Sequence, residues 1–318
     1  MIREGKLDVC LLVKTIILFL AGLNRIAIRN AAFGCSMAKL LIQPIDSLDA
    51  PELQLYRTLR RIEEHERAGV FVATNVKVVE RLFASRIEVA SALLTPEWYE
   101  KFAASLRARP ETELLVYVGE KVLLETITGY HLHQGALAVG RIPRQLTLPE
   151  LLATAPRPLL FAAVEGIASA ENLGAIVRGC AAFGTHALIV GETCVSPFQR
   201  RAVSGSMGSI FEQPVLLATN LVATLQELRA HGVRCLAADP AADATKLFEA
   251  DLRSDTCLVF GAEGPGLSEA ALRACDEVVE IPMPSHMNSL NVAAATAVFL
   301  YEATRQRGYG SSEKVMRG

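Results

Sequence analysis

Three small polar residues, Asn288, Ser289 and Asn291, stand between a strand-like run that ends at Ile281 and an Ala-rich helical run. The start of a helix presents free backbone N–H groups, and Asn or Ser side chains cap them. Such a convergence of donors suits a small polar ligand. Taken alone, the pattern is equally consistent with an ordinary capped helix.

Two upstream segments could contribute to the same site. Residues 171–178 read Glu-Asn-Leu-Gly-Ala-Ile-Val-Arg, within a helical run. Residues 258–268 read Leu-Val-Phe-Gly-Ala-Glu-Gly-Pro-Gly-Leu-Ser, which places three glycines after an apolar strand. Glycines at such a position allow either a plain turn or the close approach of a ligand to the backbone. The run lacks the G-x-G-x-x-G spacing of dinucleotide sites and the Gly-Lys-Ser/Thr of a phosphate loop.

Together, in this order and spacing, the three segments resemble the signature motifs of the SpoU (TrmH-like) branch of the SPOUT RNA methyltransferases, over about residues 157–306. The resemblance implies methyl transfer from S-adenosylmethionine to a ribose 2′-hydroxyl of ribosomal or transfer RNA. It assigns catalysis to Arg178, Asn172, Glu263, Ser289 and Asn291. It assigns cofactor binding to Gly261, Ile281, Met283 and Leu290.

Arg178 fits the stabilisation of a developing alkoxide, because a guanidinium keeps its proton and supplies a fixed positive charge. A structural salt bridge to Glu263 is the alternative for this residue. Gly174 shares a helix face with Arg178, so substrate or a partner chain could approach that face. Asn172 could orient the ribose or cap its own helix.

Other positions carry weaker expectations. Arg200 and Arg201, in a segment that resembles a family loop, could contact RNA phosphates or form a solvated charge pair. Ser285 stands where relatives usually have Gly, and His286 is expected on a loop surface rather than as a base. Further candidates for RNA contact are Arg57, Arg60, Arg61, Arg141 and Arg144.

The second half of the chain alternates apolar strands with helices, which predicts an α/β domain with a parallel sheet covered on both faces. The resemblance adds a C-terminal trefoil knot, against the general rule that chains are not knotted. Residues 46–140 also alternate, starting with a helical pattern over 51–66, and predict a small α/β sandwich. That domain resembles the ribosomal-protein-like substrate-binding domain of the family, with Thr74-Asn75 where relatives commonly have Glu-Gly.

The expected organisation has five parts: an N-terminal extension over 1–45, a substrate-binding domain over 46–140, a linker over 141–157, a methyltransferase domain over 158–308 and a tail over 309–318. The linker is expected to contain one short helix around residues 148–152. The apolar run at residues 11–23 is too short for a confident membrane span. It reads as a non-native extension before a start near Met37, as a targeting segment or as an additional helix.

Composition limits the remaining classes. The 318 residues carry a net charge of −2, which excludes a polycation. Seven scattered cysteines form no C-x-x-C pair and no zinc pattern, so we expect reduced thiols in a cytoplasmic protein without a metal. A homodimer is implied by the resemblance. A non-catalytic RNA-binding protein that keeps the SPOUT fold is the main alternative, and a nicotinamide enzyme is disfavoured because no suitable Gly-rich junction opens the sheet.

Overall fold

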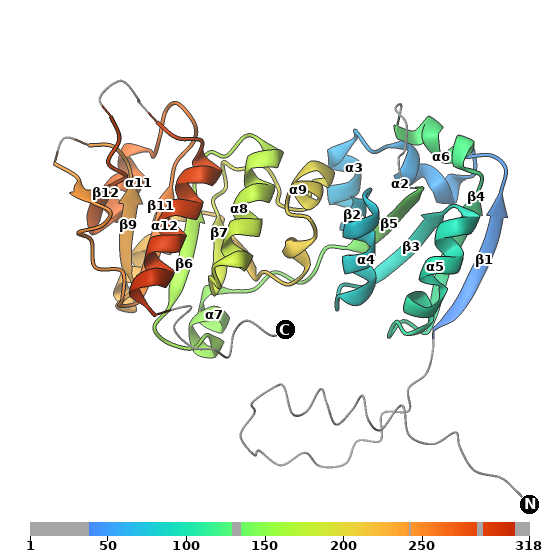
Figure 1. The fold of residues 1–318 in the computed structure, drawn as a ribbon, viewed down its shortest axis with the longest axis horizontal. Helices are drawn as coiled ribbons and strands as arrows, with labels where there is room; N and C mark the ends of the chain where they lie inside the picture. The colour runs from blue at the N-terminus through green and yellow to red at the C-terminus, as the bar shows by residue number, and fades with distance from the viewer. Residues whose placement is uncertain (1–37, 129–134, 242, 285–288, 309–318) are drawn as a thin grey trace, which may run out of the picture. The chain divides into compact units, whose positions relative to one another are not determined.

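The computed structural model describes residues 38–128, 135–241, 243–284 and 289–308. Two α/β lobes follow one another along these residues: an N-terminal lobe over 38–141 and a C-terminal lobe over 159–308 (Figure 1). Ser285, His286, Asn288 and the terminal segments 1–37 and 309–318 lie outside the described residues. Within the described part of the chain, no helix is long and apolar enough to cross a membrane.

The N-terminal lobe is built on a mixed five-stranded sheet of order β1-β4-β3-β5-β2. Its strands are β1 (Lys39–Ile45), β2 (Val70–Ala73), β3 (Val89–Leu94), β4 (Glu113–Gly119) and β5 (Ala136–Arg141). Its helices are η1 (Pro51–Leu53), α2 (Gln54–Arg57), α3 (Ile62–Arg67), α4 (Val76–Ala84), α5 (Pro96–Arg107) and α6 (Lys121–Thr128). One face of the sheet packs on α4 and α5, and the other on η1, α2 and α6.

Two details of this lobe differ from the sequence expectation. Residues 39–45 fall inside the predicted extension, whereas β1 pairs in parallel with β4 along its whole length and belongs to the sheet. The single helix expected over 51–66 is broken into three short pieces. Thr58 accounts for part of the break, because its hydroxyl donates to the Gln54 carbonyl at 3.0 Å. The break in the helix leaves the Ile62 side chain 40% exposed.

The C-terminal lobe contains a seven-stranded sheet of order β10-β12-β9-β11-β6-β7-β8, in which every pairing is parallel. Its strands are β6 (Leu160–Val164), β7 (Ala187–Val190), β8 (Val215–Leu217), β9 (Arg234–Ala238), β10 (Thr245–Lys246), β11 (Thr256–Phe260) and β12 (Glu277–Glu280). Its helices are α8 (Ala170–Ala182), α9 (Arg200–Gly205), η2 (Ser209–Phe211), α10 (Leu221–Ala230), α11 (Glu269–Ala274) and α12 (Val292–Gln306).

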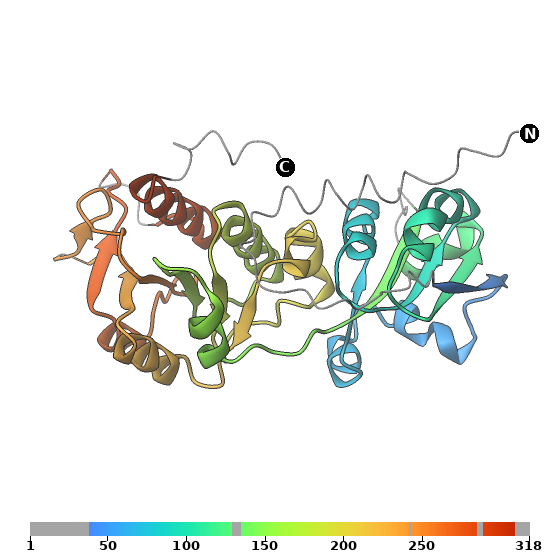
Figure 2. The same ribbon diagram turned by 90° about the horizontal axis from the view of Figure 1, so that it is seen from below.

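Side chains of this sheet alternate between two buried faces, which explains why its strands are apolar at nearly every position. One face packs on α8 and α12, and the opposite face packs on α10, α11 and α7 (Leu148–Thr154). Figure 2 shows helices on both sides of the sheet. The predicted parallel sheet with two covered faces is therefore confirmed.

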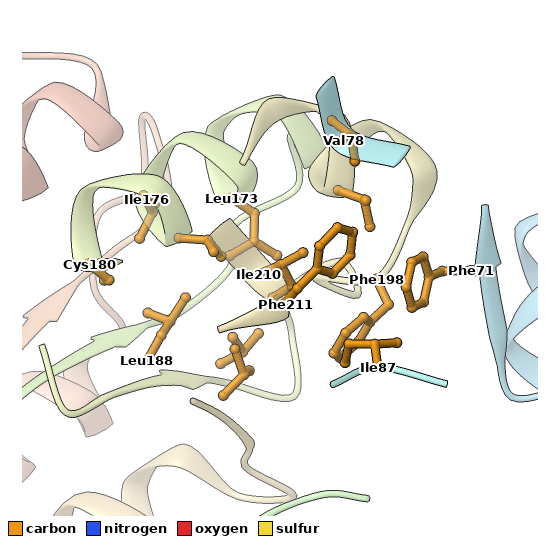
Figure 3. Close-up of a cluster of buried hydrophobic side chains, with 14 of the residues drawn as sticks. Phe71, Val78, Ile87, Leu173, Ile176, Cys180, Leu188, Phe198, Ile210 and Phe211 are labelled. Carbon is orange, nitrogen blue, oxygen red and sulfur yellow. The ribbon is translucent and has the colours of Figure 1, made fainter. Parts of the chain in front are cut away.

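The two lobes are joined by residues 142–158 and by a shared apolar cluster. Thr147 and Glu150 form a capping box that starts α7, the short helix expected in the linker. In the cluster, the Phe71 ring of β2 lies 5.8 Å from the Phe198 ring and 5.5 Å from the Phe211 ring, measured between centroids (Figure 3). Glycine is required at residue 140, because a Cβ there would lie 2.4 Å from the Phe71 ring.

Candidate active site

The carboxyl ends of three neighbouring parallel strands, β9, β11 and β12, open into one cleft beside the start of α12. Its volume is about 740 Å³, a size typical of small-molecule sites. Ligands of open α/β sheets bind at this edge, where the segments that follow the strands meet. The lining includes residues 238–240, 261–266, 279–281, 283 and 289–292.

All four residues predicted to hold a cofactor, Gly261, Ile281, Met283 and Leu290, line this cleft. Ser289 lines it as well. Behind them, the buried Phe260 and Phe299 rings meet edge to face, with centroids 5.5 Å apart and planes at 86°. The cleft thus combines an apolar wall with loop backbone and small polar side chains.

The glycine loop after β11 is a tight turn closed by its own backbone. Ala262 and Gly266 exchange two N–H···O hydrogen bonds of 3.1 and 3.0 Å. A Cβ at Gly261 would lie 2.2 Å from the Gly266 carbonyl carbon, and Gly264 has a φ of +91°. The turn itself therefore requires glycine at 261 and favours it at 264, independently of any approach by a ligand.

Asn291 connects the three sequence motifs through its side-chain amide. Its Oδ1 accepts hydrogen bonds from the backbone N–H groups of Ala293 and Ala294, at 3.0 and 3.3 Å, and caps α12. Its Nδ2 donates to Glu263 Oε1 at 2.6 Å and to Asn172 Oδ1 at 3.1 Å. Both amide protons and both oxygen lone pairs are occupied, so Asn291 fixes the positions of its neighbours.

Asn172 does not cap α8, which excludes one of its two predicted roles. Ser169 is the N-cap, and its hydroxyl accepts from the Asn172 backbone N–H at 3.2 Å. The Asn172 side chain instead accepts from Asn291, and its Nδ2 group makes no hydrogen bond to any described residue. That amide group remains available to donate to a ligand.

Arg178 is not among the residues that line the cleft. It lies six residues after Asn172 on α8, about 9 Å along the helix axis, and its side chain is exposed. The salt bridge to Glu263, which was the alternative role for Arg178, is absent between these two described residues, because Glu263 contacts Asn291 instead. The structure therefore assembles Asn172, Glu263 and Asn291 in one place and leaves Arg178 outside this group.

Gly174 has a different purpose from the one expected. A Cβ at this position would lie 2.4 Å from the Ala202 carbonyl oxygen and 2.9 Å from the Ser206 backbone nitrogen. The small residue thus lets α9 of the same chain pack against α8. Gly174 itself is covered by α9 and is therefore not open to substrate or to a partner chain.

Glu165 is a residue of the site that the sequence patterns did not single out. It follows β6, and its carboxylate accepts from the Ser268 backbone N–H at 2.7 Å and from the Ser268 hydroxyl at 2.8 Å. Ser268 in turn caps α11. This carboxylate therefore fastens the far end of the glycine loop to the strand that leads into α8.

Asp239 and Glu280 line the cleft and were also missed. Asp239 directly follows β9, and Glu280 is the last residue of β12. With Glu263 they give the cleft three carboxylates. Glu280 is ion-paired with Lys246, so Asp239 and Glu263 are the carboxylates that favour a ligand with positive charge. A signal was present in the sequence, because a polar residue directly after a buried parallel strand lies at the ligand-binding edge.

The predicted RNA-contact residues divide into two groups. Arg200 and Arg201 line a second cleft together with Arg57, Arg60 and Arg61. Arg141 and Arg144 instead form exposed ion pairs of 2.7 Å with Glu88 and Glu150. The Thr74-Asn75 turn also has a structural use, since Asn75 caps α4 by accepting from Lys77 N at 2.9 Å.

No cysteine of the described ranges lines the cleft, and these ranges hold no group of side chains suited to a metal ion. Described cysteines are free, and burial raises the pKa of Cys180 and of Cys275 to about 12, which keeps both as thiols at neutral pH. Among the described residues, no cluster of three or more His, Cys, Asp or Glu side chains could hold a metal ion.

Comparisons with known proteins point to one family. Residues 160–301 match the model of the SpoU rRNA Methylase family. The chain is 34% identical over 272 residues to an uncharacterized tRNA/rRNA methyltransferase of Mycobacterium tuberculosis, covering 83% of this chain and 92% of the relative. It is 32% identical over 231 residues to the 23S rRNA (guanosine-2'-O-)-methyltransferase RlmB of Burkholderia, covering 70% of this chain and 93% of that protein. The AdoMet-bound rRNA methyltransferase of Sinorhizobium meliloti aligns with a TM-score of 0.71 at 26% identity, over 83% of this chain and 98% of that one.

Proposed function

This chain belongs to the SpoU family of RNA methyltransferases, and we propose that it transfers a methyl group from S-adenosylmethionine to a ribose 2′-hydroxyl of ribosomal or transfer RNA. Ribosomal RNA is the first substrate to test, because the RlmB relatives are named for 23S rRNA. The observation that carries the proposal is the Asn291 amide, which holds Asn172 and Glu263 together beside the cleft.

The chemistry of the cleft fits S-adenosylmethionine. Its sulfonium and ammonium groups are cationic, and Asp239 and Glu263 line the cleft. Its adenine needs an apolar surface, which Phe260 and Phe299 supply. When bound, this cofactor supplies an activated methyl group. Backbone groups of Gly261, Ile281 and Leu290 would hold it, with Met283 beside them.

The protein's own contribution is alignment and charge. Alignment of acceptor oxygen and methyl group can lower a barrier by about 7–11 kcal/mol at best. We assign orientation of the ribose to the free Asn172 amide, with Ser289 completing the wall beside it. A positive charge next to the ribose oxygen would favour loss of its proton to water or to a phosphate oxygen. Arg178 is the candidate for that charge.

The position of Arg178 supports a homodimer in which each copy completes the site of the other. Its side chain is exposed and does not line the cleft of its own chain. The neighbouring α12 exposes two large apolar side chains, Val298 and Tyr301, at 40% and 58%. Pairing through α8 and α12 would bury these side chains and bring Arg178 to a second copy.

Two finer expectations belong to the same proposal. A trefoil knot would form in the region from β11 to α12, and the meeting of the loops after β11 and β12 at one cleft supports it. The cytoplasm is the expected compartment because ribosomal RNA, the proposed substrate, is found there and the described thiols are unpaired.

The direct test is a map of ribose methylation across total RNA from cells with and without this protein. One or a few 2′-O-methyl groups should disappear in its absence, and the purified protein should restore them with S-adenosylmethionine. An unchanged map would contradict the proposed activity. A non-catalytic RNA-binding protein is the second candidate, and calorimetry separates the two because that candidate need not bind S-adenosylmethionine.

A further inference from the structure

A second cleft, of about 1270 Å³, lies between the two lobes. Its N-terminal wall comes from residues 57–62, between α2 and α3, and from 126–127 of α6. Its C-terminal wall comes from residues 168–171, at the start of α8, and from 199–201, at the start of α9. Figure 1 shows α3 and α9, which border it.

The lining of this cleft is strongly basic. Five arginines, Arg57, Arg60, Arg61, Arg200 and Arg201, face one acidic residue, Glu171, among the fifteen lining residues. The whole chain has a net charge of −2, so this concentration of positive charge is local. A concave basic surface focuses the electrostatic field and attracts anions.

Three of the five arginines form ion pairs, two of them long, and the other two form none with any described residue. Arg57 approaches Asp49 only to 3.9 Å, and Arg201 approaches Glu171 to 3.5 Å. Arg61 has a close partner, Glu64 at 2.8 Å. Within the described residues, Arg60 and Arg200 have no ion pair.

Arg200 gives the clearest sign of a missing acceptor. Its Nε atom is buried and has no hydrogen-bond partner in the structure, although the side chain is only half-buried. Buried polar atoms normally find a partner, so the unpaired Nε shows that no described residue fixes this guanidinium, and its terminal N–H groups can turn to an anion in the cleft. A phosphate oxygen matches a guanidinium in charge and in geometry.

The basic cleft is continuous with the proposed acceptor site. Ser169, Ala170 and Glu171 line it, and the next residue is Asn172, whose side chain reaches Asn291. A strand held in this cleft would therefore lie next to Asn172, which borders the cofactor cleft through Asn291. The free N–H groups at the start of α8 add to its attraction for phosphate.

We propose that this cleft binds the sugar–phosphate backbone of the RNA strand that carries the acceptor nucleotide, and that it does so without reading base identity. This inference rests on the proposed function. The fifteen lining residues include no aromatic side chain on which a base could stack. Their neutral polar members, including Thr58, Thr126 and Gln199, suit phosphate and ribose oxygens.

The test is the salt dependence of RNA binding by a double variant, Arg60→Gln with Arg200→Gln. The probes are a short mixed-sequence single-stranded RNA and an oligouridine of equal length, followed by fluorescence anisotropy across a KCl series. The slope of log K against log salt should decrease by about 1 for each arginine removed, equally for both RNAs. The KM for ribosomal RNA should rise about tenfold, with kcat retained at saturating RNA.

The matched control is Arg86→Gln with Arg107→Gln. Both arginines are exposed, belong to the same lobe as Arg60 and do not line the cleft. The control should keep the wild-type slope and KM, and calorimetry with S-adenosylmethionine should show that both double variants are folded.

Three results would overturn the assignment: a wild-type slope in the Arg60/Arg200 variant, an equal loss in the control, or a loss confined to one RNA sequence. Failure of the proposed function has a different signature, because the wild-type protein would then transfer no methyl group to any RNA.

Discussion

The Asn291 amide donates to the Glu263 carboxylate at 2.6 Å while its carbonyl oxygen caps α12. One side chain therefore links the glycine loop of the cleft to the start of the last helix. A substitution can separate these two roles. The side-chain oxygen caps α12, whereas only the amide nitrogen donates to Glu263 and Asn172.

Asn291→Asp keeps the capping oxygen, loses both amide donors and places a second carboxylate beside Glu263. We expect the stabilisation by the cap to be kept, a thermal stability below wild type from repulsion between the two carboxylates, and methyl transfer reduced by a hundredfold or more. Asn291→Ala removes the cap as well, and should also lower the free energy of unfolding by about 1 kcal/mol. Paired measurements of denaturant unfolding and turnover check this. Equal activity in Asn291→Asp and wild type would show that the link is dispensable.

Arg178→Ala should abolish methyl transfer and largely keep S-adenosylmethionine binding, because Arg178 lies outside the cofactor cleft. Mixing two inactive variants tests whether Arg178 acts in the site of a second copy of the chain. If it does, inactive Arg178→Ala combined with inactive Asn172→Ala should recover roughly a quarter of wild-type activity, since each mixed dimer has one intact site. No recovery, in subunits shown to exchange, would place Arg178 in the site of its own chain. Unchanged turnover in Arg178→Ala would remove it from the mechanism.

Glu165→Gln should weaken S-adenosylmethionine binding about tenfold, because charged hydrogen bonds to Ser268 are stronger than neutral ones and fix the glycine loop. Glu269→Gln is the matched control, since this exposed carboxylate is adjacent to Ser268 and forms a surface ion pair with Arg273. Calorimetric titration of both variants with S-adenosylmethionine measures the two affinities. Similar affinities in the two would mean that the loop keeps its shape without Glu165.

Gly174→Ala should destabilise the protein by about 1–3 kcal/mol, because the new Cβ would overlap the Ala202 carbonyl oxygen. Gly179→Ala, on the same helix, meets no atom within 4 Å and should stabilise it by about 0.5–1 kcal/mol. Chemical denaturation of the two variants measures the difference. A neutral Gly174→Ala variant would mean that α8 and α9 can separate at little cost.

The buried thiol of Cys180 should make stability decrease at high pH. Burial raises its pKa from 9.0 in the unfolded chain to about 12 in the folded protein. Between these values the folded state holds a proton that the unfolded state has lost, so folding is opposed by about 1.4 kcal/mol per pH unit. Stability relative to Cys180→Ala should therefore be constant below pH 9 and fall between pH 9 and 12. If the free energies of unfolding of wild type and Cys180→Ala changed equally with pH, ionisation of the Cys180 thiol would be excluded as the cause.

The pattern of apolar strands predicted the C-terminal sheet closely, because strands buried on both faces leave a continuous apolar signal. Within it, β9 matches the apolar run at residues 235–238 and lies between β12 and β11 in the parallel sheet. The edge strand β1 was missed because its apolar run, residues 40–42, is short and is followed by Gln43 and Pro44, and most of its residues are exposed or half-exposed. α9 was missed because its six residues carry no helical periodicity long enough to detect.

The site was predictable only in part. Asn172 and Asn291 are separated by 119 residues, and no local pattern places their side chains 3.1 Å apart. The family resemblance placed both residues in one site through the order and spacing of three motifs, but their hydrogen bond was not predicted. The purpose of Gly174 could not be inferred, since a glycine on a helix face permits close approach without indicating what approaches.

Phe71 lies at the contact between the lobes, almost fully buried against Phe198 and Phe211. Sliding of one lobe across the other would expose this ring to water, which opposes such motion. The arginines on the two walls of the basic cleft should therefore keep a constant spacing. A nucleic-acid strand would meet a preorganised surface and lose little affinity to the ordering of the protein.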